Sequence, residues 1–252
     1  MAAAPVLPSP TPEAAPLSEM ARIVDVFIAP SKIFTDLRRN ASWWAPFLLL
    51  CLMSEVFVYT VDQKIGFRKV AENQIQASPK AAERIEQLPA PQREQAMQRQ
   101  TTFFRNFSYS YPVVILIWNV LVAAILFATF KFAASAEIKF KTALAVVMYA
   151  SLPLLVKTIL ATISVAVGAS ADSFTFQNPV ATNPGYFLNP ADSHFLYSFA
   201  TAMDIFMFWT LVVTAIGFSC VSKVKRSTAL AIVIGWYLVF ALTSAGLGSL
   251  FS

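Results

Sequence analysis

Four polar side chains interrupt long apolar stretches of this chain, and they are the residues best placed to carry chemistry. They are Glu55, Asn119, Lys157 and Asp204. A charged side chain inside a bilayer costs about 2.5–3.5 kcal/mol on insertion scales, so it is expected to have a partner or to mark an ion or proton pathway. Counting about 1.5 Å per residue along each stretch places all four at similar depth, in one layer of the outer half of the membrane.

Side-chain direction predicts which members of this layer pair. Cα–Cβ bonds tilt toward the N-terminus of a helix. Glu55 and Lys157 lie on stretches that cross in the same direction, so both lean the same way, whereas Asp204 leans away from them. We therefore expect Glu55–Lys157 as the closer pair, with Asp204 second and Asn119 as a neutral bridge. The first interpretation is a buried clamp that fixes helix packing, and the alternatives are a proton or ion pathway, snorkelling side chains or a water-filled vestibule.

The apolar stretches that carry these residues are long enough to cross a hydrocarbon core of about 30 Å as helices. They are Trp44–Thr60, Pro112–Phe130, Thr142–Val167, Leu196–Val221 and Ala229–Leu250. The composition agrees, because 57% of the 252 residues are hydrophobic and 13% are charged, against about 25% charged in a soluble domain. The sequence predicts an all-α polytopic membrane protein with five transmembrane helices and excludes an ordinary soluble enzyme.

The remaining segments suggest a simple domain organisation. Residues 1–16 form an Ala/Pro-rich disordered tail, and residues 17–43 form an amphipathic segment in the membrane interface, broken at Pro30 with Ser31 as the N-cap of its second helix. Residues 44–252 form the membrane domain. A helical arm, 63–108, is inserted between the first two spans, and its apolar faces are expected to pack as an external hairpin. An irregular cap is expected over 169–195 because three Asn-Pro pairs lie there.

Orientation follows from Lys and Arg. Basic residues gather before the first span, in the 131–141 turn and in the 222–228 turn, and are absent from 169–195 and from the C-terminal end. The positive-inside rule then predicts a cytoplasmic N-terminus and an external C-terminus in a bacterial inner (plasma) membrane. The 63–108 arm carries eight Lys and Arg on the outer side, but long loops obey the rule weakly.

Several short runs resemble one family. The run Val26–Phe34, the run Trp43–Leu49, the element Tyr149–Pro153, and Asp204–Trp209 followed by Gly217 resemble the bacterial members of the Yip (Ypt-interacting protein) domain family. The resemblance implies five spans and a cytosolic N-terminus, and its eukaryotic members bind Rab-type GTPases. Those members carry Asp-Leu-Tyr-Gly-Pro at the first span, where this chain has only the proline, Pro46, after Trp44-Ala45. Pro153 removes a backbone bond to the Tyr149 carbonyl and is expected to kink the third span.

No enzyme motif is present in the sequence. There is no GxSxG, HExxH or phosphate-binding loop, and the single histidine and two cysteines lack metal-ligand spacing. We therefore expect neither catalysis nor a cofactor, a metal or a nucleic-acid partner. The sequence favours a non-enzymatic membrane organiser or adaptor that binds an unknown protein at its N-terminal segment or at the 63–108 arm. The alternative is a small transporter or channel built around the polar layer.

Overall fold

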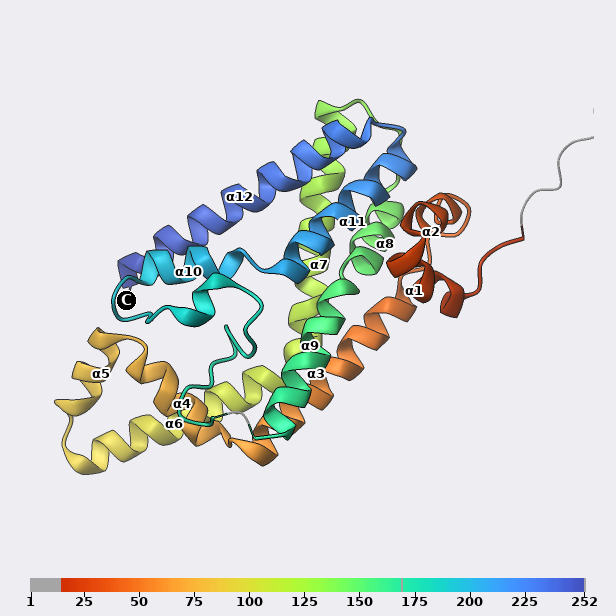
Figure 1. Ribbon diagram of the computed structural model, residues 1–252. Helices are drawn as coiled ribbons and strands as arrows, with labels where there is room; N and C mark the ends of the chain where they lie inside the picture. Colours follow the sequence, from red (N-terminus) through yellow and green to blue (C-terminus); the bar gives the residue numbers. More distant parts are fainter. Residues whose placement is uncertain (1–14, 169, 252) are drawn as a thin grey trace, which may run out of the picture.

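The computed structural model describes residues 15–168 and 170–251, and the regular elements of this part are all helical (Figure 1). In chain order they are α1 (Glu19–Ile28), α2 (Pro30–Asp36), α3 (Trp44–Lys64), α4 (Phe67–Gln76), α5 (Pro79–Glu86), α6 (Ala90–Tyr109), α7 (Tyr111–Ala128), the π-helical turn η1 (Thr129–Ala133), α8 (Phe140–Ala150), α9 (Pro153–Ala166), the 3-10 turn η2 (Pro184–Phe187), α10 (His194–Ala202), α11 (Ile205–Ser222) and α12 (Arg226–Phe251). The all-α class is confirmed. Almost all of the predicted 1–16 tail lies outside the described residues.

Five helical segments are long and apolar enough to cross a membrane. They are Trp44–Lys64, Tyr111–Ala133, Phe140–Ala166, Ile205–Ser222 and Arg226–Ser249. The shortest has 18 residues, which at 1.5 Å per residue is about 27 Å. The predicted five-span, multi-pass architecture is therefore confirmed. Each of these segments overlaps one of the five apolar stretches predicted from the sequence.

Two of the five predicted stretches are interrupted. In the third, α8 ends at Ala150 and α9 begins with Pro153 at its first position, where the missing N–H costs nothing. In the fourth, α10 ends at Ala202, and the chain leaves the helical conformation before α11, with Asp204 extended at φ −84° and ψ 134°. The prediction of one continuous helix over Leu196–Val221 is wrong for this reason.

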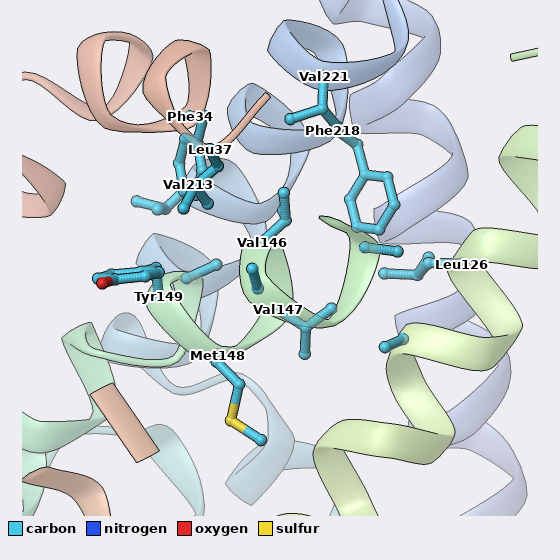
Figure 2. Close-up of a cluster of buried hydrophobic side chains, with 14 of the residues drawn as sticks. Phe34, Leu37, Leu126, Val146, Val147, Met148, Tyr149, Val213, Phe218 and Val221 are labelled. Atoms are coloured by element: carbon cyan, nitrogen blue, oxygen red, sulfur yellow. The ribbon is translucent and has the colours of Figure 1, made fainter. Parts of the chain in front are cut away.

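Helix α8 lies at the centre of the main core. All eight of its residues from Ala143 to Ala150 are buried, and side chains of α2, α7 and α11 surround it (Figure 2). Gly217 lets α11 approach α8 closely, because a Cβ there would lie 2.6 Å from Cγ1 of Val146. Nearby, the rings of Phe130 and Phe218 stack with centroids 4.5 Å apart. The first contact holds α11 against α8, and the second holds it against η1 at the end of α7.

The N-terminal segment forms the two helices α1 and α2, which pack on this core. The apolar face of α2, with Ile33, Phe34 and Leu37 fully buried, covers the bundle beside α11. The predicted cap is wrong, because Ala29 is the N-cap of α2 and Ser31 lies one position after Pro30, inside the first turn. Proline is preorganised for the first helical position, so the helix begins at Pro30, two residues earlier than a Ser31 cap would place it.

The segment between the first two spans forms α4, α5 and α6, and α4 packs along α6 (Figure 1). The Arg68 guanidinium binds Glu94 through two nitrogens, at 2.7 and 3.0 Å. At the base, the rings of Phe67 and Tyr109 lie 6.1 Å apart, and the Tyr109 hydroxyl donates to Asp62 at 3.0 Å. We call these three helices the arm.

The arm is also fixed to the chain that follows α9. The side-chain amide of Asn73 donates to the backbone carbonyls of Ala171 and Phe174, at 2.7 and 2.9 Å. Lys69 forms an ion pair with Asp172 at 2.6 Å. The Phe174 ring is almost fully buried. It packs in an aromatic cluster whose other members are Phe57, Phe67 and Phe176.

Candidate functional site

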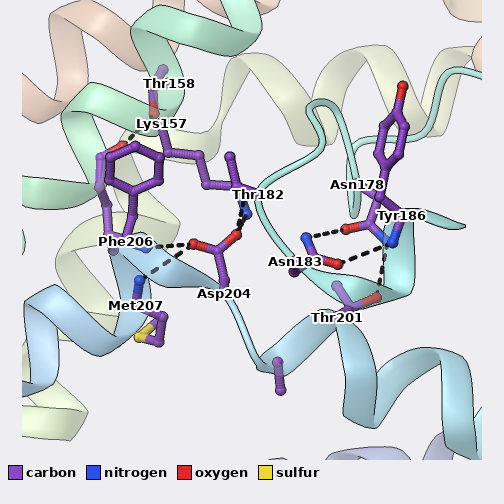
Figure 3. A network of polar contacts seen from close by, with 12 residues as sticks. Lys157, Thr158, Asn178, Thr182, Asn183, Tyr186, Thr201, Asp204, Phe206 and Met207 are labelled. Carbon is purple, nitrogen blue, oxygen red and sulfur yellow. Dashed lines mark hydrogen bonds and ion pairs between the residues drawn. The ribbon is translucent and has the colours of Figure 1, made fainter.

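The most concentrated polar contacts between spans lie at the break between α10 and α11 (Figure 3). Asp204 is the N-cap of α11: its Oδ1 accepts the backbone N–H groups of Phe206 at 2.9 Å and of Met207 at 3.3 Å. Its Oδ2 accepts Lys157 Nζ of α9 at 2.7 Å and also the Thr182 hydroxyl. Both carboxylate oxygens are thus fully used, which is what a buried carboxylate requires.

The observed pair corrects the predicted one. Lys157 binds Asp204, and the expectation that Glu55 is its closer partner is wrong. The tilt rule for Cα–Cβ bonds holds only within a helix, and Asp204 is extended, so its side chain is free to turn toward α9. Aspartate is a preferred N-cap residue, and that property was the sequence signal for the break.

The other two residues of the predicted layer have separate environments. Asn119 of α7 donates to the Ile115 carbonyl at 2.8 Å and accepts the Ser151 hydroxyl at 3.0 Å, so it joins α7 to the break between α8 and α9. Glu55 of α3 has one buried carboxylate oxygen without a hydrogen-bond partner among the described residues. Neither residue has a hydrogen bond or ion pair with Lys157 or Asp204.

The loop before α10 contributes residues to this site that the sequence did not indicate. The Thr182 carbonyl accepts the N–H of Ile205, so the loop is bonded to the first residue of α11 by backbone as well as side chain. Asn178 donates to the Thr201 hydroxyl at 2.9 Å, and Asn183 donates to Asn178 at 2.7 Å (Figure 3). The expected irregular cap is therefore ordered by the side chains of its asparagines, beyond the turns that Asn-Pro pairs predict.

Gly185 allows the same loop to lie directly on α10. A Cβ at this position would clash with the Thr201 hydroxyl and would lie 2.7 Å from the Thr201 backbone nitrogen. On the opposite side of the break, the Tyr237 hydroxyl of α12 donates to the Ala202 carbonyl, the last of α10. The helix break is thus held by α9, by α12 and by the loop together.

A second polar cluster joins the N-terminal helices to α8. Arg22 has a side chain only 1% exposed, and it contacts Asp36 through Nη2 at 2.7 Å and through Nε at 2.9 Å. It also contacts Glu19 at 3.2 Å, and the other Glu19 oxygen accepts the Tyr149 hydroxyl. Burial alone would lower the pKa of Arg22, but the neighbouring carboxylates together outweigh burial and raise that pKa above its ordinary value.

Of the motif positions, Tyr149 belongs to this second cluster, and Pro46 and Pro153 lie in the first turns of their helices. Tyr149 is fully buried at the end of α8, Pro153 begins α9, and Pro46 lies in the first turn of α3, where it is also buried. Arg22, one of the basic residues that precede the first span, is among the largest fully buried side chains. Among residues 15–168 and 170–251, no group of three or more His, Cys, Asp or Glu side chains could hold a metal ion.

The long apolar helices, with polar contacts placed between them, define a polytopic helical membrane protein. The Yip1 domain model matches residues 24–247, which is most of the chain, and the chain belongs to that family. No curated protein and no solved structure is detectably similar to it.

Proposed function

We propose that the chain is a non-enzymatic membrane organiser of the bacterial Yip type, which binds a protein partner through its helices outside the spans. The observation that carries the proposal is the complete internal use of the Asp204 carboxylate, which has two backbone donors and two side-chain donors. The Asp204 carboxylate therefore stabilises the packing of the helices around it and has no oxygen left for another ligand.

This arrangement favours a packing clamp over an ion pathway. In a transport site, an ionisable group must exchange its protein partner for a substrate or a proton. Releasing Lys157 from Asp204 would leave a carboxylate, itself 5% exposed, without its counter-ion, and removing one partner of a buried pair is strongly unfavourable. The separate environments of Glu55 and Asn119 support the same proposal, because a relay would need them near the pair.

The arm is the better candidate for a partner surface. Its helices are held to each other through Arg68 and Glu94, and to the loop through Asn73 and Phe174. A surface held in place before binding loses less conformational entropy on association. In our proposal the arm lies outside the membrane, on the side opposite to α1 and α2.

We expect Asn73→Ala to loosen the arm, because it removes the donor for two loop carbonyls. The amides of residues 67–76 and 170–176 should exchange faster with deuterium, and partners captured in mild detergent should be lost. Gln74→Ala is the matched control, since Gln74 is the exposed neighbour on the same helix. Equal capture by both variants and the unchanged protein would count against the arm as the partner surface.

We further propose that the chain lies in the plasma membrane with its N-terminus in the cytoplasm. Ser18 and Ala191 are exposed and lie at opposite ends of the spans. With Cys51 and Cys220 replaced by alanine, a membrane-impermeant maleimide should label Ala191→Cys in intact cells and label Ser18→Cys only after lysis. The reverse pattern would invert the proposed orientation.

A further inference from the structure

A shallow, open groove of about 830 Å³, lined by residues of α6 and its C-cap, runs along the exposed side of this helix. Its principal lining residues are Gln98, Arg99, Thr102, Phe103, Asn106 and Phe107. It begins at Ser110, where α6 meets the membrane-spanning α7, so it opens at the level where the span leaves the bilayer. Among residues 15–168 and 170–251, no acidic side chain lines it.

Arg99 gives the groove a free positive charge. The helix α6 has three arginines: Arg93 donates to the Glu86 carbonyl at 2.7 Å, and Arg105 lies 3.5 Å from Asp62. Arg99 has no hydrogen bond or ion pair with any residue in the described ranges. A guanidinium has five donors in a planar fork that matches a phosphate group. The charge therefore suits an anionic ligand bearing phosphate or carboxylate.

Exposed aromatic side chains lie along the groove and at the start of α7. Phe103 and Phe107 are 60% and 47% exposed, and their rings stack on successive turns at 5.9 Å. Tyr111 is the next residue at the same four-residue spacing, and Val113 and Ile117 continue as exposed apolar residues on the span itself. Aromatic side chains at the end of a span are typical of the membrane–water interface.

From these features, and independently of the proposed partner role, we infer that the groove binds the headgroup of an anionic phospholipid from the leaflet on the arm's side. The Arg99 guanidinium pairs with the lipid phosphate, and the amides of Gln98 and Asn106 donate to the headgroup oxygens. The upper acyl chain carbons lie along Phe103 and Phe107. Free phosphate would satisfy Arg99 but would leave both rings in water, and this difference favours a lipid.

The test uses the full chain with Cys51 and Cys220 replaced by alanine and with Thr102→Cys placed in the groove. The alkylation rate of this thiol is followed in neutral-detergent micelles with phosphatidylglycerol, phosphatidylcholine or inorganic phosphate added. Of these three additions, we expect only phosphatidylglycerol to slow alkylation of the Thr102→Cys thiol. Arg99→Gln should raise the phosphatidylglycerol concentration needed for half of this protection by about tenfold, as for the loss of one charge-assisted hydrogen bond.

Arg84→Gln is the control, since Arg84 is an exposed arginine of the arm that does not line the groove. It should leave the protection unchanged. The thermal midpoint without lipid should be the same for Arg99→Gln and for the unchanged protein, because Arg99 has no partner to lose. Equal protection by inorganic phosphate would replace the lipid by a free anion. Equal protection by phosphatidylcholine, or protection that survives Arg99→Gln, would overturn the proposed site.

Discussion

Lys157→Met is expected to lower the free energy of unfolding by about 3–5 kcal/mol, the range for removing one partner of a buried ion pair. The variant strands the Asp204 carboxylate, which is 5% exposed and would keep only its hydroxyl and backbone donors. Unfolding in detergent, followed by circular dichroism over a denaturant series, measures the loss. A fall below about 1 kcal/mol would mean that the pair is solvated like a surface salt bridge.

A double-mutant cycle separates this pair from the one that side-chain direction predicted. Asp204→Asn keeps an N-cap oxygen for Phe206 but removes the charge, so Lys157→Met combined with Asp204→Asn should recover much of the loss. Glu55→Gln is the control, because Glu55 has no hydrogen bond or ion pair with Lys157, and its effect should add to that of Lys157→Met. Coupling to Glu55 and none to Asp204 would show that the observed contact is not the one that stabilises the protein.

The architecture could be predicted because it depends on local composition. Each span is a long apolar run with few charges, and that property is visible in the chain without knowledge of any neighbour. The breaks were harder to predict. Pro153 signals its break through its missing N–H, but Asp204 lies in a run that is apolar on both sides. Its role depends on Thr182, 22 residues earlier, and on Lys157, 47 residues earlier.

Arg22 shows the same limit at the other end of the chain. The amphipathic pattern of residues 17–40 groups Arg22 with Lys32, Arg38 and Arg39 and predicts a basic side that faces the headgroups. The structure buries it because Asp36 of α2 neutralises it and because Tyr149, distant in sequence, binds Glu19. Periodicity describes which residues share a face of one helix, but it does not say whether that face meets lipid, water or another helix.

Arg22→Met should therefore detach the N-terminal helices from the core. The methionine fills part of the same volume, but Asp36 is 9% exposed and would lose both of its contacts with the guanidinium. Leaving a buried carboxylate unpaired should cost about 3–5 kcal/mol. We expect a lower thermal midpoint in detergent and faster tryptic cleavage after Lys32, which lies on α2 and is present in every variant compared.

Two further variants make the result specific to the buried charge. Asp36→Asn in the Arg22→Met background should restore part of the stability, because it removes the stranded charge. Arg38→Met is the matched control: Arg38 is exposed at the end of the same pair of helices, and its loss should change stability by less than about 0.5 kcal/mol. If Arg22→Met and Arg38→Met have the same stability and the same cleavage rate, the cluster does not hold α1 and α2 on the bundle. The N-terminal segment would then be free to lie in the membrane interface, as its sequence alone suggests.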